Sequence, residues 1–223
     1  GDALTEVELQ DGSLVRGHHV VNTLPLPQIK SLFNGSSNSL LDETPYASIA
    51  VANLTYAKRG VAPIDGFGYL VPRASAHDSK ALGVVLDSCA LPQQDLGADV
   101  SRLTVMLGNP QAGSLAALEQ DALETLRHHL GITMDPADID VTVDRQCIPT
   151  YTVGYVRRLQ AMHEWVMAEM RGRMSVVGAA YGGPAVPHCV LHARDLANEL
   201  NLNALETQPL GVTGLEEIIC SFE

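Results

Sequence analysis

The stretch 178-GAAYGGPAVPHCVLHARDLANEL-200 places a glycine-rich turn between an apolar segment and a helical pattern. The segment Met174 to Ala180 has the length and composition of a buried strand. A helix is predicted from about Pro187 to Leu200, since proline is tolerated in a first turn. Glycines let a backbone approach a ligand closely, and free N–H groups at a helix start favour an anion or a polarised carbonyl. The turn is therefore a candidate binding site, although an ordinary tight connection has the same pattern.

The rest of the chain predicts an α/β (α+β) fold with a mixed or antiparallel sheet. A hairpin is expected near the start, where Asp11-Gly12 separates two alternating segments. Four short β-branched segments follow without a long helix between them, which favours antiparallel or mixed pairing. Those segments are 48–56, 66–71, 82–86 and 103–107. Later helices are predicted after Ser114 and over about 154–170, and a further strand over 139–143.

Composition excludes some classes of protein. The 223 residues have a net charge of −12, which argues against nucleic-acid binding because phosphate contacts need clustered Lys and Arg. No apolar run has the roughly 18 residues needed to span a bilayer, and no signal peptide is evident. The four cysteines have no CxxC spacing and are expected to be buried free thiols. The first residue is Gly1, and we expect the chain to be a piece of a longer protein.

Other catalytic and metal-binding patterns are weak. His188 and His192 are four residues apart and could share a metal. The sequence has no third ligand at a spacing typical of a metal site, so we expect both histidines to lie on the helix surface. No GxSxG elbow occurs, and Cys89 follows an apolar segment where inert packing is expected. No catalytic residue and no metal site is assigned.

Several stretches together resemble the protoporphyrinogen oxidase family of flavoenzymes, relatives of the flavin amine oxidases. They are 19-HVVNTLPLPQI-29, 66-GFGYLVPR-73, 82-LGVVLDSCALPQQD-95, 103-LTVMLG-108, 147-CIPTYTVGYVRRL-159 and 178-GAAYGGPAV-186. The resemblance runs from about residue 5 to 200 and is to the carboxy-terminal portion of that family. It implies that 1–33 are returning strands of an FAD-binding domain and 34–145 a substrate-binding domain. It further implies that 146–203 complete the FAD-binding domain, while 204–223 form a tail of unclear role.

The resemblance also implies a reaction and its partners. The family removes six hydrogens from protoporphyrinogen IX to give protoporphyrin IX, using FAD and molecular oxygen, with hydrogen peroxide as the by-product. A homodimer, peripheral membrane association and, in eukaryotes, the mitochondrial inner membrane are implied in the same way. Phe67, Gly68 and Leu70 would line the substrate pocket; the alternative is that Phe67 and Leu70 are plain core residues. Pro184 to Val186 would contact the flavin.

Two further points qualify this resemblance. Ala185 lies inside that flavin-contacting turn, and Val143 lies near another flavin contact of the family. Pro187-His188 stands where the family usually has Asn-Asp, and the family's amino-terminal GxGxxG unit does not occur in this chain. We therefore expect the isolated chain to be inactive. A related amine or carotenoid oxidoreductase and a non-catalytic porphyrin-binding derivative remain alternatives.

Overall fold

The chain forms two compact units. The computed structural model describes residues 4–33, 43–72, 80–95, 97, 99–108, 110, 114–200 and 209–220. Unit 1 combines Gly1–Tyr46 with Ile148–Glu223, and unit 2 is Ala47–Cys147. The predicted boundaries after 33 and 203 lie next to or within segments outside the described residues, and the assignment of segments to an FAD domain and a substrate domain stays a prediction.

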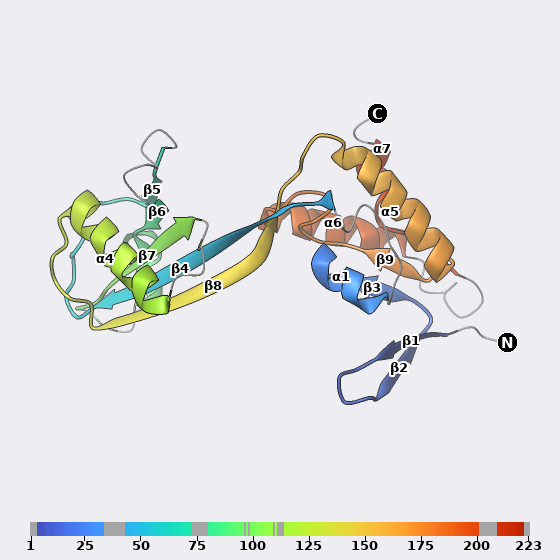
Figure 1. Cartoon of the computed structure of the whole chain (residues 1–223), viewed down its shortest axis with the longest axis horizontal. Coiled ribbons are helices and arrows are strands. Elements are labelled where there is room, and N and C mark those ends of the chain that lie inside the picture. The colour runs from blue at the N-terminus through green and yellow to red at the C-terminus, as the bar shows by residue number, and fades with distance from the viewer. Residues whose placement is uncertain are drawn as a thin grey trace. The chain divides into compact units, whose positions relative to one another are not determined.

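Unit 1 contains a hairpin and a small parallel sheet (Figure 1). Strands β1 (Thr5–Glu8) and β2 (Leu14–Gly17) pair antiparallel, as Asp11-Gly12 predicted. Strand β3 (Val20–Asn22) pairs in parallel with β9 (Met174–Val176), so segments more than 150 residues apart become neighbours. The strand predicted over 174–180 is therefore shorter than expected, because the chain turns away after Val177.

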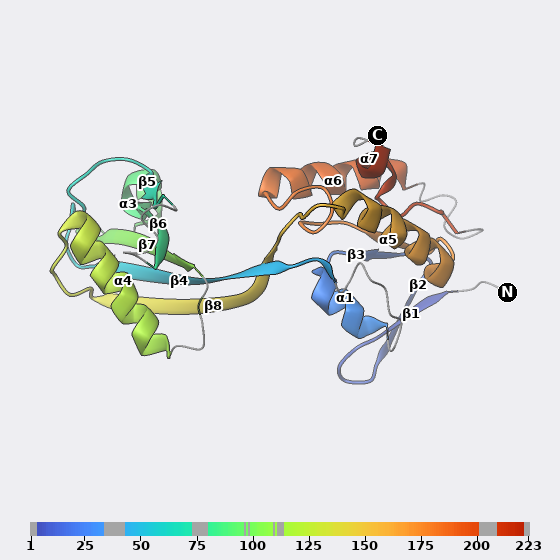
Figure 2. The same ribbon diagram turned by 45° about the horizontal axis from the view of Figure 1, so that its top comes forward.

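Helices surround the parallel sheet of unit 1, and α5 lies over β9 (Figure 2). They are α1 (Leu26–Leu32), α5 (Tyr155–Met170), α6 (Val186–Glu199) and α7 (Glu216–Cys220). Helices α5 and α6 match the predicted spans within one or two residues. Leu159, Met162 and Val166 recur on one face of α5 and are buried against Met174 and Val176 of β9. Helix α7 falls in the tail whose role the sequence left unclear.

Unit 2 is a five-stranded sheet in the order β5-β6-β7-β4-β8 with helix α4 packed on it. The strands are β4 (Tyr46–Tyr56), β5 (Gly68–Leu70), β6 (Ala81–Val85), β7 (Ser101–Gly108) and β8 (Asp138–Pro149). The pairs β5–β6, β6–β7 and β4–β7 are antiparallel. Along β7, buried and half-buried residues alternate, so one face forms the core. The predicted fold class is confirmed.

Helix α4 (Leu115–Leu130) shows how local sequence sets its ends. The Ser114 side chain accepts a hydrogen bond from the Ala117 amide, and Gly131 adopts the left-handed conformation that ends the helix. Two short elements of unit 2 were not predicted, namely α3 (Asp87–Ala90) and the 3₁₀ turn η2 (Pro92–Gln94). Four residues or fewer are too short for periodicity to reveal.

The expectation of buried cysteines was wrong. All four thiols are free, but Cys89 and Cys220 are exposed and Cys147 and Cys189 half-buried. Cys89 follows the buried strand β6 but lies in α3, which contributes no buried residue. Within the described part of the chain, none of the helices has the length and apolar character to cross a membrane.

Candidate functional site

The glycine-rich turn connects β9 to α6 and contains two positions that require glycine. Gly178 and Gly183 have φ of +137° and +136°, conformations that other residues rarely adopt. A Cβ atom on Gly183 would also overlap the imidazole of His188, with the ring carbon Cγ at 2.7 Å. The missing Cβ of the buried Gly183 therefore makes room for the His188 ring, while Gly178 lies half-buried.

The predicted flavin-contacting residues lie at the exposed start of α6. Pro184, Ala185 and Val186 are all exposed, and Val186 is 76% exposed despite its apolar side chain. Ala185 occupies the cap position and has no side-chain cap hydrogen bond. Pro187 has no N–H, and the His188 amide donates to the Ala185 carbonyl at 2.9 Å. Among the described residues, the Val186 N–H is left without a partner in the first turn.

Two tyrosines hold the turn from the side of α5, and the sequence interpretation did not single them out. Tyr155 donates its hydroxyl hydrogen to the Ala180 carbonyl, and Tyr151 donates to the Ala179 carbonyl at 2.6 Å. The two rings stack with centroids 4.1 Å apart. Burial raises the pKa of Tyr155 far above its ordinary value, so its hydroxyl remains a donor. The available signal was the four-residue spacing of these tyrosines across a helix start.

Tyr181 lies within the turn and is almost fully buried. It is 1% exposed, and burial strongly raises its pKa. Among the described residues its hydroxyl has no hydrogen-bond partner. The buried Tyr155 hydroxyl beneath the turn is therefore hydrogen-bonded, whereas the buried Tyr181 hydroxyl within the turn has no partner among the described residues.

The predicted substrate-lining residues lie in unit 2. Phe67 and Leu70 are 74% and 76% exposed, so the alternative that they are core residues is wrong. Between them, Tyr69 packs toward the core and shares a 3.0 Å hydrogen bond with His129 Nδ1. Burial raises the pKa of Tyr69 to about 12. Gly68 has φ of +146°, and a Cβ there would overlap the Val84 carbonyl of the neighbouring strand.

Val143 differs from the other predicted contacts. It lies on β8, and its half-buried side chain packs against the core of unit 2. Val143, Phe67, Gly68 and Leu70 thus belong to unit 2, whereas Pro184 to Val186 belong to unit 1. Their assignment to cofactor and substrate stays a prediction.

A cavity of about 560 Å³ in unit 2 contains none of the predicted residues. Its polar lining includes Arg59, Asp65, Ser88, Asp95 and Arg102. Arg102 Nε lies 2.7 Å from Asp95 Oδ1, and its hydrogen bond is the largest cause of the lowered pKa of that carboxyl. Because Arg102 is paired with Asp95 and the charges of Arg59 and Asp65 are opposite in sign, this lining is nearly neutral and indicates no particular ligand.

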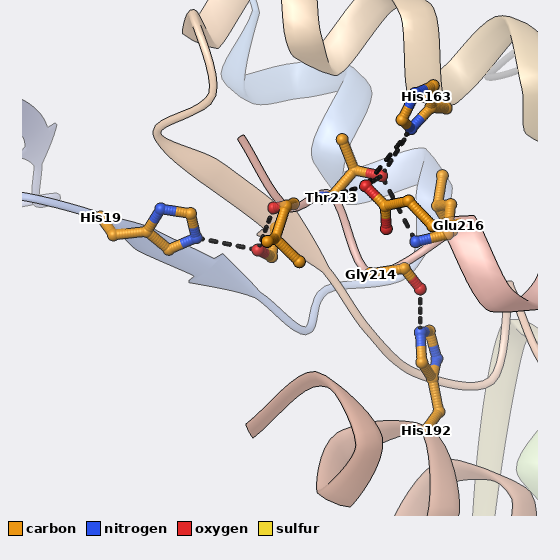
Figure 3. A network of polar contacts seen from close by, with 9 residues as sticks. His19, His163, His192, Thr213, Gly214 and Glu216 are labelled. Atoms are coloured by element: carbon orange, nitrogen blue, oxygen red, sulfur yellow. Dashed lines mark hydrogen bonds and ion pairs between the residues drawn. The ribbon is translucent and has the colours of Figure 1, made fainter. Parts of the chain in front are cut away.

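Three histidines from different parts of the chain support residues 212–216, an irregular segment that runs into α7 and that we call the tail segment (Figure 3). His192 donates from Nε2 to the Gly214 carbonyl at 2.5 Å, and His163 Nδ1 lies 2.8 Å from Thr213 Oγ1. His19 Nε2 lies 2.8 Å from Ser175 Oγ, which in turn donates to the Val212 carbonyl at 2.6 Å. Residues 212–216, which belong to the tail whose role the sequence left unclear, are therefore anchored in unit 1.

The expectation that both histidines of α6 lie on the helix surface was wrong for His192. His188 is exposed, but His192 is only 7% exposed, because the face of α6 that carries His192 packs toward the tail segment. Within the described ranges, no group of three metal-ligating side chains occurs. The spacing of the two histidines thus reflects one structural contact and one exposed ring.

Comparisons with known proteins show what the chain is similar to. No family model matches the chain. Protoporphyrinogen oxidase of Macaca fascicularis is 33% identical over 218 residues, covering 92% of this chain and 44% of the relative. The Homo sapiens protein of the same name is 33% identical over 216 residues, covering 92% and 43%. The chain thus spans less than half the length of these relatives.

A solved structure gives the same fold. A candidate protoporphyrinogen oxidase from Exiguobacterium sp. 255-15 superposes with a TM-score of 0.76 at 24% identity, covering 91% of this chain and 45% of that one. The resemblance to protoporphyrinogen oxidase that the sequence indicated is confirmed, as is its partial extent.

Proposed function

We propose that this chain is part of an FAD-dependent protoporphyrinogen oxidase and contributes one wall of the substrate site and one end of the flavin site. The similarity to mammalian protoporphyrinogen oxidases, at 33% identity over 92% of the chain, supports this most strongly. The reaction would convert protoporphyrinogen IX to protoporphyrin IX with molecular oxygen, within haem synthesis.

The turn before α6 fits one end of a flavin. Gly183 lets the His188 ring pack against the turn, and Val186 offers an apolar side chain together with an N–H that has no partner among the described residues. A helix start stabilises negative charge, which a flavin gains on reduction. The residues that would hold FAD here are Pro184, Ala185 and Val186. When bound, FAD would accept the hydrogens taken from the substrate.

Phe67, Gly68 and Leu70 would form an apolar wall for the porphyrinogen. A flat macrocycle needs aliphatic and aromatic contacts with few polar groups. Large side chains that are three-quarters exposed fit this role better than a role in the core, and Gly68 allows close strand packing beside them. These residues would orient the substrate and exclude water. None of them carries a group that titrates, and no catalytic residue is assigned.

Three properties of the whole enzyme extend the proposal. A homodimer, peripheral association with a membrane and, in a eukaryotic cell, placement on the mitochondrial inner membrane would follow from the family resemblance.

Val143 would contact the flavin through its backbone, since its side chain faces the core of unit 2.

A chimera tests the proposed function. The matching part of human protoporphyrinogen oxidase would be replaced by this chain, and flavin absorbance and porphyrin fluorescence would be measured. We expect a yellow chimera that oxidises protoporphyrinogen IX, and an isolated chain that is colourless and inactive. Phe67→Ala should raise KM with little loss of flavin, whereas Leu32→Ala, at another exposed apolar position outside the proposed sites, serves as the control.

Other outcomes would contradict the proposal. A yellow chimera that oxidises an amine but not the porphyrinogen would assign the chain to a related oxidase. A chimera that binds porphyrin without flavin would favour the non-catalytic alternative, to which the Pro187-His188 departure points. Appreciable porphyrinogen oxidation by the purified 223-residue chain would contradict the expectation that it is incomplete.

A further inference from the structure

A small pocket of about 100 Å³ in unit 1 is lined by α6, α7 and the tail segment. Its apolar lining consists of Leu191, Leu196 and Ile218, and the backbone of Gly182 and Gly214 also borders it. The pocket contains none of the residues assigned to the flavin or to the substrate. It is also too small for either, because pockets for ligands of that size have roughly 300 Å³ or more.

His192 of α6 contributes a buried hydrogen-bond acceptor to this pocket. It is 7% exposed, and its Nε2–H donates to the Gly214 carbonyl, so the other ring nitrogen of the neutral ring is an acceptor (Figure 3). Among the described residues this nitrogen, Nδ1, has no hydrogen-bond partner. It lies 3.8 Å from the position that a Cβ atom on the exposed Gly182 would take. A buried acceptor at this place favours a ligand that carries a hydrogen-bond donor.

The same pocket has two carboxylates that lack a counter-charge. Glu199 ends α6 and Glu217 belongs to α7, and neither has an ion-pair partner among the described residues. The remaining acid of the lining, Asp195, is paired with Arg194 at 3.1 Å. Burial raises the pKa of Glu199, and nearby carboxylates, above all Glu216 and Glu217, raise it further. The pocket therefore has an excess of negative charge, supplied by both helices.

We propose that this pocket binds a flexible organic dication, namely the two ammonium groups of an aliphatic diamine or polyamine. Glu199 and Glu217 would each accept from one ammonium group, and His192 Nδ1 would accept a further N–H. Leu196 and Ile218 would contact the methylene chain, as apolar surface does along a lysine side chain. The ligand would join α6 to α7 and so support the tail segment. This inference is independent of the proposed function.

Other ligands fit the pocket less well. In the part of the chain that the structure describes, no three ligating side chains lie close enough together to hold a metal ion. A chain with a charge at each end can reach acceptors that lie further apart. An anion would add to the negative charge of the lining, and a single ammonium group would leave one of the two carboxylates unpaired.

Calorimetric titration of the full chain tests the proposal. The probes are 1,4-diaminobutane, butylamine, which has one charge, and MgCl₂. Physiological salt screens the general attraction of cations to a chain with a net charge of −12. We expect the diamine to bind about tenfold or more tightly than butylamine, since a second charge-assisted hydrogen bond is worth that factor, and MgCl₂ to show no saturable binding.

A double variant locates the site. Glu199→Gln with Glu217→Gln removes both charges and keeps the size of the side chains. Glu8→Gln with Glu169→Gln is the matched control, because these exposed glutamates lie outside the pocket and the change in net charge is the same. We expect the first pair to weaken diamine binding about tenfold or more, and the control pair to bind like the wild type. Equal binding by the two double variants, or no binding by the wild type, would overturn the inference.

The His192 ring provides a readout that general charge attraction would not change. In a chain with isotope-labelled histidine, the nitrogen resonance of His192 Nδ1 should move upfield when the diamine binds, because it then accepts a hydrogen bond. The exposed His128 serves as the control ring. An unmoved Nδ1 resonance would place the diamine elsewhere and overturn the inference. Butylamine that binds as tightly as the diamine would also overturn it, and would assign the pocket to a single ammonium group, such as a lysine side chain.

Discussion

Tyr155 and Tyr181 are two buried phenols of unit 1 that differ in one respect. The Tyr155 hydroxyl donates to the Ala180 carbonyl, whereas the Tyr181 hydroxyl has no partner among the described residues. Burial raises the pKa of both, so both remain protonated at neutral pH. At the scale of single residues, they allow the value of one hydrogen bond beneath the turn to be measured.

Replacing each tyrosine by phenylalanine should have opposite effects. Tyr155→Phe leaves the Ala180 carbonyl without its donor and should lower the free energy of unfolding by about 1–3 kcal/mol. Tyr181→Phe removes a buried polar atom that has no partner and should be neutral or slightly stabilising. Urea denaturation followed by the fluorescence of Trp165, the single tryptophan, reports on unit 1. An equal loss in both variants would contradict the hydrogen-bond assignment.

At the scale of elements, the tail segment is supported by a histidine whose neutral form is favoured. Ser175 donates its one hydroxyl hydrogen to Val212, so it must accept from the Nε2–H of His19. The other ring nitrogen of His19 is buried with no partner in the described residues. Burial, and secondly the charge of Arg173, lowers the pKa of His19. The Nε2–H donor is present in both forms of the ring, so protonation opposes the burial of the ring rather than this bond, because the added Nδ1–H has no acceptor among the described residues.

We expect the tail segment to become less stable on acidification. The unfolded chain binds a proton at His19 near pH 6.5, but the folded chain only at lower pH, so the free energy of unfolding falls as the pH drops below about 6.5. A second loss should begin below about pH 4.5. Burial raises the pKa of Glu216, but hydrogen bonds from Thr213 and the nearby His163 outweigh it and lower the pKa overall.

Exchange of the Val176 amide measures this effect, because its N–H donates to Thr213. Protection should be lower at pH 5.5 than at pH 7.5 after correction for intrinsic exchange. His19→Gln keeps a donor and does not titrate, so its protection should vary less with pH. The same pH response in His19→Gln and wild type would assign the effect to other groups.

At the scale of the whole molecule, the two units differ in how the chain builds them. Unit 2 is one continuous segment with its own core, whereas unit 1 is assembled from two segments. We expect residues 47–147, expressed alone, to unfold in a single cooperative transition, since the core needs no contribution from outside. Thermal unfolding followed by circular dichroism checks this. A gradual, featureless melt would contradict it.

The sequence predicted elements that local rules determine. Asp11-Gly12 marked the hairpin, and Ser114 and Gly131 marked the ends of α4. The tail segment escaped prediction, because its shape rests on local bonds from the Thr213 amide to Glu216 and from the Leu215 amide to Thr213 Oγ1, in an irregular loop without a periodic pattern. The burial of His192 could not be predicted, because its partner is a backbone carbonyl 22 residues further along the chain.

The candidate site was predictable only in part, for a similar reason. Glycine spacing indicated the turn, and family resemblance indicated Phe67 and Leu70. Tyr155 opens α5 and Tyr151 lies just before it, and only packing brings both to the turn. The pocket lined by α6 and α7 was not predicted either, because its two unpaired carboxylates come from separate helices whose contact the sequence does not indicate.

The route by which the chain enters and leaves unit 2 has a further consequence. The Thr150 amide donates to the Pro45 carbonyl at 2.8 Å, so the outgoing and incoming strands are tied together just before residue 47 and just after residue 147. Recombination at these two neighbouring positions would exchange unit 2 as one continuous segment and require only two short joins. If unit 2 forms the substrate site as proposed, such an exchange would change the substrate specificity and leave the core of unit 1 unchanged.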